Sequence, residues 1–102
     1  LFLYGKGLRF DAVMTSDDSL AVGAVKFAHA ANIPVPDELS IIGYNSSILS
    51  RCTDPEITSI DSKVEALCTT TINTLMGVFS GMNVPSRTTI ASDLIKRQTT
   101  NF

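Results

Sequence analysis

The feature that most constrains the fold is an alternation of short apolar runs with a longer amphipathic stretch. Residues 10–15 and 40–44 are brief apolar runs of the kind that form buried strands. Between them, apolar residues recur at helical spacing from Leu20 to Ala31, which predicts an amphipathic helix. Parallel strands need a crossover connection, usually a helix. The sequence therefore predicts an α/β fold with a mainly parallel sheet flanked by helices.

The predicted helices have recognisable ends. Polar N-cap residues at 16–19 precede the first helix, and Asn32 follows it at a position suited to a left-handed cap. Ser62 and Glu65 form a capping-box pattern that opens a second helix, which Gly81 ends. Further strands are expected at 56–60, 88–91 and 94–97. The core stripe predicted for the first helix is Leu20, Ala24, Phe27, Ala28 and Ala31, and that of the second is Val64, Leu67, Cys68, Thr71, Leu75, Val78, Phe79 and Met82.

Composition excludes several classes of protein. The 102 residues, 44% hydrophobic and with a net charge of -2, fit one domain and are too apolar for disorder. No apolar run is long enough for a membrane span, and clustered basic residues for gripping nucleic acid are missing. The first residues lack the basic and apolar regions of a signal peptide. Because the sequence opens on Leu1 rather than Met, we expect a piece of a longer protein.

The residues that support catalysis or metal binding are sparse. His29 is the only histidine and lies within the first helix, where we expect an ordinary histidine, either on the helix surface or packed. Cys52 and Cys68 form no metal-binding pair, and we favour free thiols, with a disulfide as the alternative. No phosphate-binding glycine motif or cluster of catalytic groups is present. We therefore predict a protein that is not an enzyme and needs no cofactor.

Polar residues follow the first two predicted strands and are candidates for ligand binding. Asp17 comes after the first strand and Asn45 after the second. In open α/β sheets, ligands bind beyond the carboxyl ends of the strands. A carboxylate and an amide there can hydrogen-bond to the hydroxyl groups of a sugar or another polyol. The alternative is that Asp17 caps the helix and Asn45 forms a turn.

Four segments together resemble one family in order and spacing. They are Phe10–Val13 with the following Asp18, Ala21 and Gly23; Ile33–Asn45; Ile57–Ile60; and Leu94–Thr100. They are similar to segments of the lactose/galactose-repressor (LacI/GalR) family of bacterial transcription regulators. The resemblance covers nearly the whole chain. It implies part of a two-lobed, type I periplasmic-binding-protein-like effector domain.

The resemblance implies a fragment of a cytoplasmic, ligand-responsive repressor. Its effector would be a sugar or a related small metabolite, with a maltose-like sugar as one candidate. DNA would be bound only through an N-terminal headpiece absent from this sequence, and no membrane contact is implied. The alternative function is an extracytoplasmic sugar-binding protein of a transport system with the same fold.

The family's ligand-binding positions fall on four residues of this sequence. Asp17 stands where the family often has Asn, and Asn45 stands where it usually has Asp. This exchange alters the pattern of donors and acceptors, so lactose-like specificity does not follow. Ser62 and Val64 match positions that line the effector cleft, with helix N-cap as the competing role of Ser62.

The resemblance also implies a homodimer that pairs through the first helix and the loop after the second strand. Val22 lies off the predicted core stripe, so this valine needs another partner, unless it is a lone apolar surface residue. The residues expected at this interface are Val22, Lys26, Ser50, Arg51 and Cys52.

The chain should form one incomplete domain over residues 1–102. Residues 1–60 and 93–102 resemble the C-terminal lobe of the parent fold, whereas 61–92 cross the hinge and include a helix of the other lobe. An apolar helix face cannot remain in water, so this helix is expected to fold back onto the strands or to pack against a second chain. Half a cleft is expected to bind sugar weakly or not at all.

Overall fold

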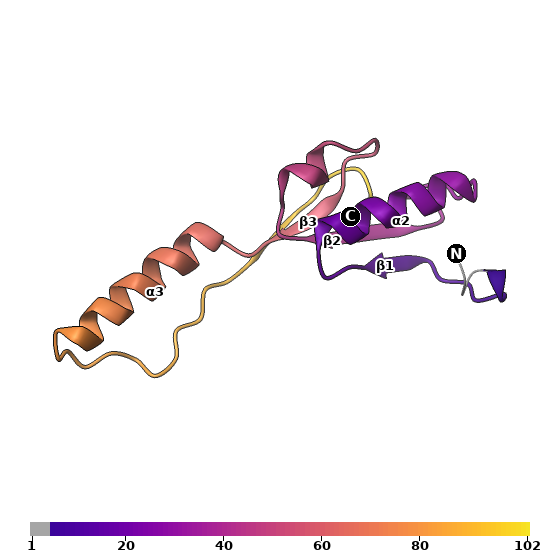
Figure 1. The fold of residues 1–102 in the computed structure, drawn as a ribbon. Helices are drawn as coiled ribbons and strands as arrows, with labels where there is room; N and C mark the ends of the chain where they lie inside the picture. The colour runs from indigo at the N-terminus through magenta and orange to yellow at the C-terminus, as the bar shows by residue number, and fades with distance from the viewer. Residues whose placement is uncertain (1–4) are drawn as a thin grey trace.

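The computed structural model of the chain describes residues 5–102 (Figure 1). The expected lack of a signal peptide rests on the first residues of the chain, and residues 1–4 lie outside the described part. The elements, in chain order, are β1 (Ala12–Met14), α2 (Asp18–Ala30), β2 (Ser40–Tyr44), the 3-10 helix η1 (Ile48–Arg51), β3 (Thr58–Asp61), α3 (Val64–Phe79) and β4 (Asp93–Ile95). No helix in the described part is long and apolar enough to span a membrane.

The sheet has the strand order β1-β2-β3-β4. The first three strands are parallel, with Val13 opposite Ile41 and Ile42 opposite Thr58, and β4 runs antiparallel to β3. The predicted α/β class with a mainly parallel sheet is confirmed. The prediction of a strand at 88–91 is wrong, because that segment has no neighbouring strand to pair with among residues 5–102.

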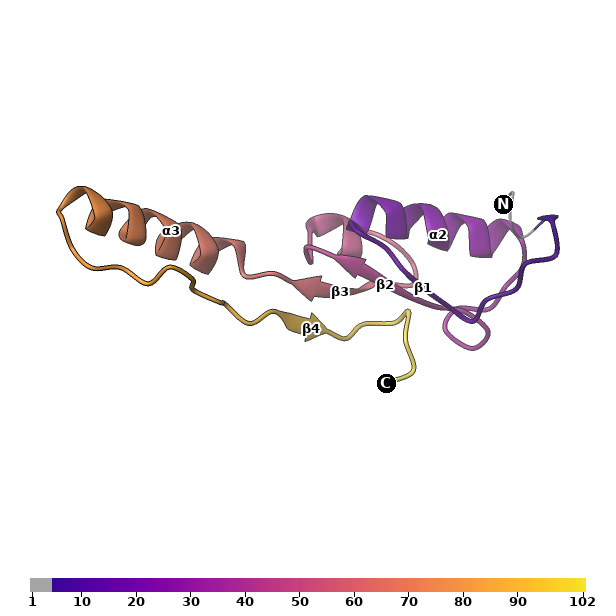
Figure 2. The same ribbon diagram turned by 90° about the horizontal axis from the view of Figure 1, so that it is seen from below.

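Helix α2 covers one face of the sheet (Figure 2). Its buried apolar residues are Ala21, Val25 and Ala28, which pack with Leu39, Ile41 and Ile57 in the core. The stripe predicted for this helix is therefore displaced, and Leu20 is 57% exposed. The physical reason is Asp18, whose buried carboxylate accepts hydrogen bonds from Ser59 of β3 and from Ser47 before η1 and so fixes the rotation of the helix.

The predicted helix ends are confirmed in part. Asp17 caps α2 by accepting the Ser19 amide, and Asn32 takes the expected left-handed conformation. The prediction of a capping box at the start of the second helix is wrong. The N-cap of α3 is Lys63 in a left-handed conformation, with no side-chain cap, and the Lys63 amide donates instead to Asp61. Gly81 has a φ of 74° just beyond α3, as a helix stop requires.

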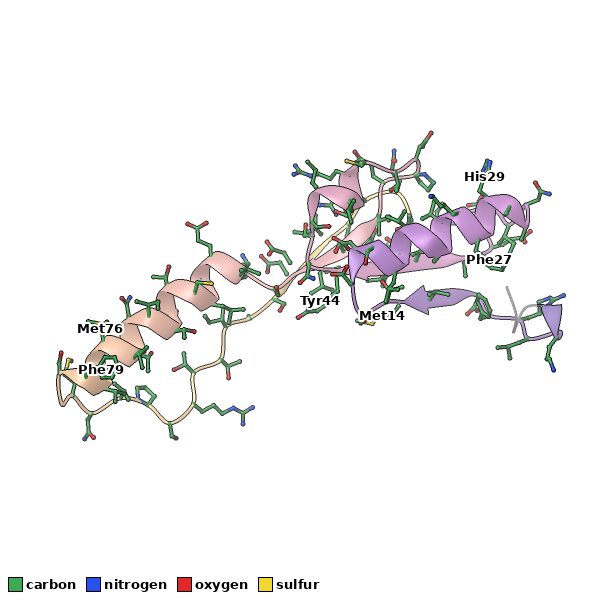
Figure 3. The ribbon with its side chains drawn as sticks, in the orientation of Figure 1. Met14, Phe27, His29, Tyr44, Met76 and Phe79 are labelled. Atoms are coloured by element: carbon green, nitrogen blue, oxygen red, sulfur yellow. The ribbon has the colours of Figure 1, made fainter. Side chains whose placement is uncertain are left out.

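Helix α3 extends away from the sheet (Figures 1 and 2). We call residues 64–92 the α3 arm, and residues 5–61 with 93–102 the sheet region. The described chain measures 59 × 26 × 21 Å, and Gly77 is the only buried residue of α3. Met76 and Phe79 lie near the end of α3 far from the sheet (Figure 3). The exposed apolar residues of the arm are Val64, Leu67, Ile72, Leu75, Met76, Val78, Phe79 and Met82.

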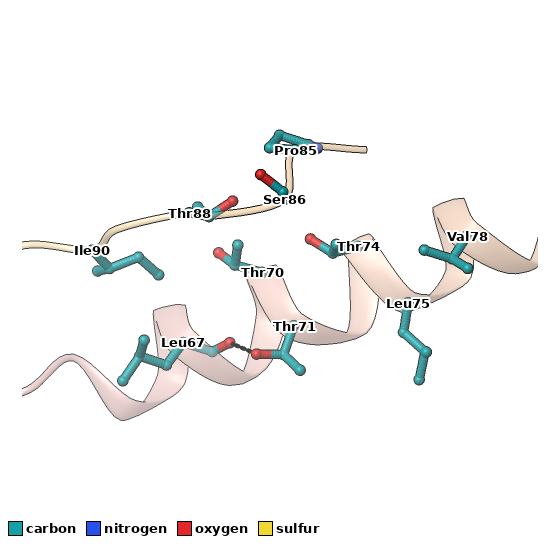
Figure 4. A pocket seen from close by; sticks show the side chains of 10 residues that line it. All are labelled: Leu67, Thr70, Thr71, Thr74, Leu75, Val78, Pro85, Ser86, Thr88 and Ile90. Carbon is teal, nitrogen blue, oxygen red and sulfur yellow. Dashed lines mark hydrogen bonds between the residues drawn. The ribbon is translucent and has the colours of Figure 1, made fainter. Parts of the chain in front are cut away.

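The α3 arm does not fold back onto the strands, so that version of the prediction is wrong. The strands β3 and β4 pair side by side and direct both connections away from the sheet. The returning segment after α3 then runs along the helix and encloses a groove of about 390 Å³ with it. Thr70 and Thr74 face this segment, whereas Leu75 points away from it (Figure 4).

Candidate functional site

The carboxyl ends of β1, β2 and β3 meet at one edge of the sheet because the three strands are parallel. Asp17 and Asn45 follow two of these strands, and the Asn45 amide nitrogen donates to the Asp17 carboxylate over 2.6 Å. Asp61 ends the third strand. The structure thus brings the two residues predicted from the strand ends into direct contact. We call Asp17, Asn45, Asp61 and Lys63 the polar edge.

Asp17 serves as a helix cap and as a member of the polar edge at once. One carboxylate oxygen accepts from the Ser19 hydroxyl over 2.6 Å and from the Ser19 amide over 3.1 Å, and the other accepts from Asn45. These hydrogen bonds, the Ser19 hydroxyl first, hold the pKa of the Asp17 carboxyl below its usual value. Asp17 is therefore a charged acceptor at neutral pH.

A groove of about 680 Å³ lies beside the polar edge, between the strand ends and the start of α3. Two of the predicted ligand-binding residues, Asn45 and Val64, line it, whereas Asp17 and Ser62 do not. Asp17 reaches the groove only through its hydrogen bond with Asn45. The residues that line the groove are Asn45, Asp61, Lys63, Val64, Glu65, Ala66, Thr69 and Thr70.

Asp61 and Lys63 were not predicted as site residues. Asp61 directly follows the predicted strand 56–60, so the rule that selected Asp17 and Asn45 also selects it. No sequence pattern indicates Lys63, because its ion-pair partner, Asp93, lies 30 positions later in the chain. Its ammonium group lies 2.6 Å from the Asp93 carboxylate at the start of β4. The hydrogen bond with Asp93 and its charge raise the pKa of Lys63.

A buried hydrogen-bond network lies beneath the polar edge. Asp18 has no exposed surface, and its carboxylate accepts from the Ser47 amide, the Ser47 hydroxyl and the Ser59 hydroxyl over 2.6, 2.7 and 2.6 Å. The Arg97 guanidinium donates to the Ser46 hydroxyl over 2.9 Å. It also donates to the Ser50 hydroxyl over 3.0 Å and to the backbone carbonyl preceding β3 over 2.7 Å. This network joins the start of α2, the segment around η1 and the chain after β4.

The residues predicted for a dimer interface lie on α2 and around η1. Lys26, Arg51 and Cys52 are exposed, and Val22 is partly buried against the core. Ser50 has no exposed surface, so in this conformation it cannot itself contact a second chain. A hollow of about 330 Å³ lies on this side of the molecule, lined by Val22, Val25, Lys26, His29, Thr53 and Asp54.

Two predictions about single residues are confirmed. Cys52 and Cys68 are free thiols, although Cys68, which the predicted core stripe of the second helix includes, is exposed rather than packed. His29 lies exposed on the surface of α2 and points away from the sheet (Figure 3).

The sequence matches the periplasmic binding protein-like domain over residues 4–100. The chain therefore belongs to this family, and its mainly parallel sheet with a covering helix agrees with that class. Its relatives are regulators. It is 54% identical to an HTH-type transcriptional regulator of Lachnoclostridium phytofermentans over 98% of this chain and 30% of the relative. It is 28% identical to the HTH-type transcriptional regulator AscG of Escherichia coli over 93% of this chain and 28% of the relative.

Solved structures agree with the fold. The lac repressor dimer bound to operator and the anti-inducer ONPF matches with a TM-score of 0.90 and 26% identity, over 96% of this chain and 34% of that chain. A LacI transcriptional regulator from Alkaliphilus metalliredigens complexed with D-xylulofuranose has a TM-score of 0.78 and 28% identity, over 91% of this chain and 35% of that chain. The resemblance to the LacI/GalR family is confirmed. The chain spans about a third or less of the proteins it matches and corresponds to part of their effector-binding domain.

Proposed function

We propose that the chain is the part of a cytoplasmic transcriptional repressor that contributes one side of a cleft for a sugar or a related polyhydroxylated metabolite. The observation that carries this proposal is the 2.6 Å contact between Asn45 and Asp17 beside the groove. Asp17 supplies a charged acceptor. The Asn45 side-chain oxygen accepts no hydrogen bond within the described residues, which leaves it available to a hydroxyl donor.

The rest of the cleft belongs to the other lobe of the intact domain. We assign residues 1–60 and 93–102 to the C-terminal lobe, and 61–92 to the hinge crossing and a helix of the other lobe. The exposed pair of Lys63 and Asp93 joins both connections at this crossing. Closure of the two lobes on the ligand would shift the balance between two arrangements, which is how effector binding could alter DNA affinity.

Assembly and DNA binding are proposed for the whole protein. Val22, Lys26, Arg51 and Cys52 would lie at a homodimer interface, and DNA would be bound by a headpiece outside this sequence. The relatives are regulators, and they do not favour the alternative of a transport protein. Within the proposal, maltose remains the first sugar to test, followed by cellobiose, galactose and lactose.

The test uses a chimera in which this chain replaces the matching segment of the Lachnoclostridium regulator, whose 54% identity favours compatible packing. Calorimetric titration with the four sugars should detect binding by at least one. Asn45→Gly removes the side chain without strain because the φ of Asn45 is 94°. We expect it to weaken binding about tenfold, the value of one good hydrogen bond.

The matched control is Asn32→Gly, which removes the same side chain at a φ of 55° near the opposite end of α2. It should leave the dissociation constant unchanged. A folded chimera that binds none of the four sugars contradicts the proposal, as does an Asn45→Gly variant that binds as tightly as its parent.

A further inference from the structure

The turn after β2 holds Asn45 in an unfavourable backbone conformation. Asn45 and Ser46 have φ angles of 94° and 46°, and neither is glycine. A left-handed conformation costs free energy for residues that carry a Cβ, and two in succession are rarely adopted without outside support. The turn therefore persists because contacts from elsewhere in the fold stabilise it.

Arg97 supplies one of those contacts through the Ser46 hydroxyl, and most of the others converge on one carboxylate. Asp18 accepts both the amide and the hydroxyl of Ser47. It also accepts the Ser59 hydroxyl, whose oxygen in turn accepts the Ser46 amide over 2.9 Å. The two residues that follow Asn45 are thus tied to Asp18, one directly and one through Ser59.

The position of Asp18 leaves its carboxylate little freedom. The residue has no exposed surface, and a methyl group at Gly43 would collide with the carboxylate. The carboxylate accepts three hydrogen bonds, and Asp18 is the first residue of α2. An apolar residue here would leave the Ser47 amide and the Ser59 hydroxyl without this acceptor, and an unsatisfied buried donor costs free energy. Asp18 therefore has a hydrogen-bonding role as well as a packing role.

We propose that Asp18 is the positioning residue of the polar edge. By fixing the turn at Ser46 and Ser47, it holds the side chain of Asn45 beside Asp17 and so sets the affinity for the hydroxylated ligand. Asp18 does not itself line the groove. This inference rests on the proposed function for its effect on binding, whereas its effect on the turn is independent of any ligand.

The experiment compares variants of the same chimera. Ser47 and Ser59 donate to different oxygens of the Asp18 carboxylate. Asp18→Asn keeps the shape but replaces one of these oxygens by an NH2 group, which cannot accept a hydrogen bond. Ser59→Ala removes the link to Ser46 and one hydrogen bond to Asp18, but it leaves both hydrogen bonds between Asp18 and Ser47 in place. The control is Thr100→Val, which removes one buried hydrogen bond of 2.7 Å to Thr58.

Two quantities are measured for each folded variant: the dissociation constant of the sugar that the parent chimera binds, and amide hydrogen exchange over residues 44–48. We expect exchange there to accelerate at least about tenfold in Asp18→Asn, with affinity falling about tenfold. Ser59→Ala should show smaller changes in the same direction. Thr100→Val, compared at equal distance from its melting temperature, should change neither quantity.

The outcomes separate the two proposals. If the parent chimera binds no sugar, the proposed function fails, while the exchange data still decide whether Asp18 holds the turn. The positioning role is contradicted if exchange over 44–48 is unchanged in both variants, or if the control accelerates it equally. It is also contradicted if the turn loosens in Asp18→Asn while sugar affinity stays the same. Should Asp18→Asn fail to fold, Ser59→Ala decides the question alone.

Discussion

In the sheet region Ile41 and Ile57 have no exposed surface, whereas in the α3 arm Leu75 and Phe79 are 45% and 74% exposed. Both regions carry an amphipathic helix with a comparable apolar stripe. The helix of the sheet region has strands of its own chain to cover, and that of the α3 arm has only one returning segment. An apolar stripe therefore predicts a helix, but the burial of that stripe depends on whether its packing partner is present in the same chain.

The largest expected difference between the regions concerns core truncation. Ile41→Ala should lower the free energy of unfolding by roughly 2–5 kcal/mol, because it removes fully buried methyl groups and leaves a cavity. Leu75→Ala, on the exposed arm, should cost about 1 kcal/mol or less. Denaturant unfolding of the 102-residue chain, at concentrations where it is monomeric, measures both. Equal losses would show that the α3 arm has a core that this structure does not contain.

A second difference concerns glycine within the sheet region itself. Gly43→Ala should destabilise the chain by roughly 1–3 kcal/mol, because the new methyl group meets the Asp18 carboxylate. Gly23→Ala on α2 meets nothing within 4 Å and should stabilise the helix by about 0.5–1 kcal/mol. Thermal unfolding of the two variants side by side checks the opposite signs. A Gly43→Ala variant as stable as the parent would contradict the tight contact.

A third prediction concerns the exposed face of the α3 arm. In the isolated 102-residue chain this face should pack against a second copy, because its apolar side chains are otherwise left in water. Phe79→Ser should weaken that association roughly tenfold. Leu20→Ser, which removes an exposed apolar side chain from the sheet region, should leave the association unchanged. Light scattering over a concentration series measures this. A chain that stays monomeric at all concentrations would overturn the expectation.

The smallest expected effects are those of pH. The pKa of Asp17 is lowered in the folded chain, so its stabilising contribution is present above the unfolded value and is lost as the pH falls below about 4. The pKa of Lys63 is raised, so its contribution is present at neutral pH and is lost as the pH rises above about 10. Both side chains are partly exposed, and each effect is small.

Melting curves from pH 2 to 11 test this pair of signs. Asp17→Asn should reduce only the fall in melting temperature at acid pH, and Lys63→Met should reduce only the fall at alkaline pH. If Asp17→Asn leaves the fall in melting temperature at acid pH intact, that fall is caused by other carboxyl groups.

Part of the fold and of the polar edge could be predicted because it depends on neighbours in the sequence. The apolar runs gave the order of strands and helices. Parallel topology then places the residues after β1 and β2 at one edge, and for this reason the sequence alone indicates Asp17 and Asn45, which are in contact in the structure.

The remainder depends on contacts between residues far apart in the chain. The rotation of α2 follows from Asp18, whose partners Ser47 and Ser59 lie 29 and 41 positions later, so helical periodicity alone placed the stripe wrongly. The ion pair between Lys63 and Asp93 likewise joins residues that lie far apart in the chain. The predicted strand at 88–91 failed for the opposite reason, since its local β-propensity is real but no partner strand is available in the described chain.

The most direct test of the account is a crystal structure of the chimera with the sugar that it binds. We predict that ligand hydroxyls lie within hydrogen-bond distance of the Asn45 side chain and of the Asp17 carboxylate, with Asp18 still bonded to Ser47 beneath them. A sugar bound without contact to either Asp17 or Asn45 would contradict the assignment of the polar edge as the ligand-binding side of this fold.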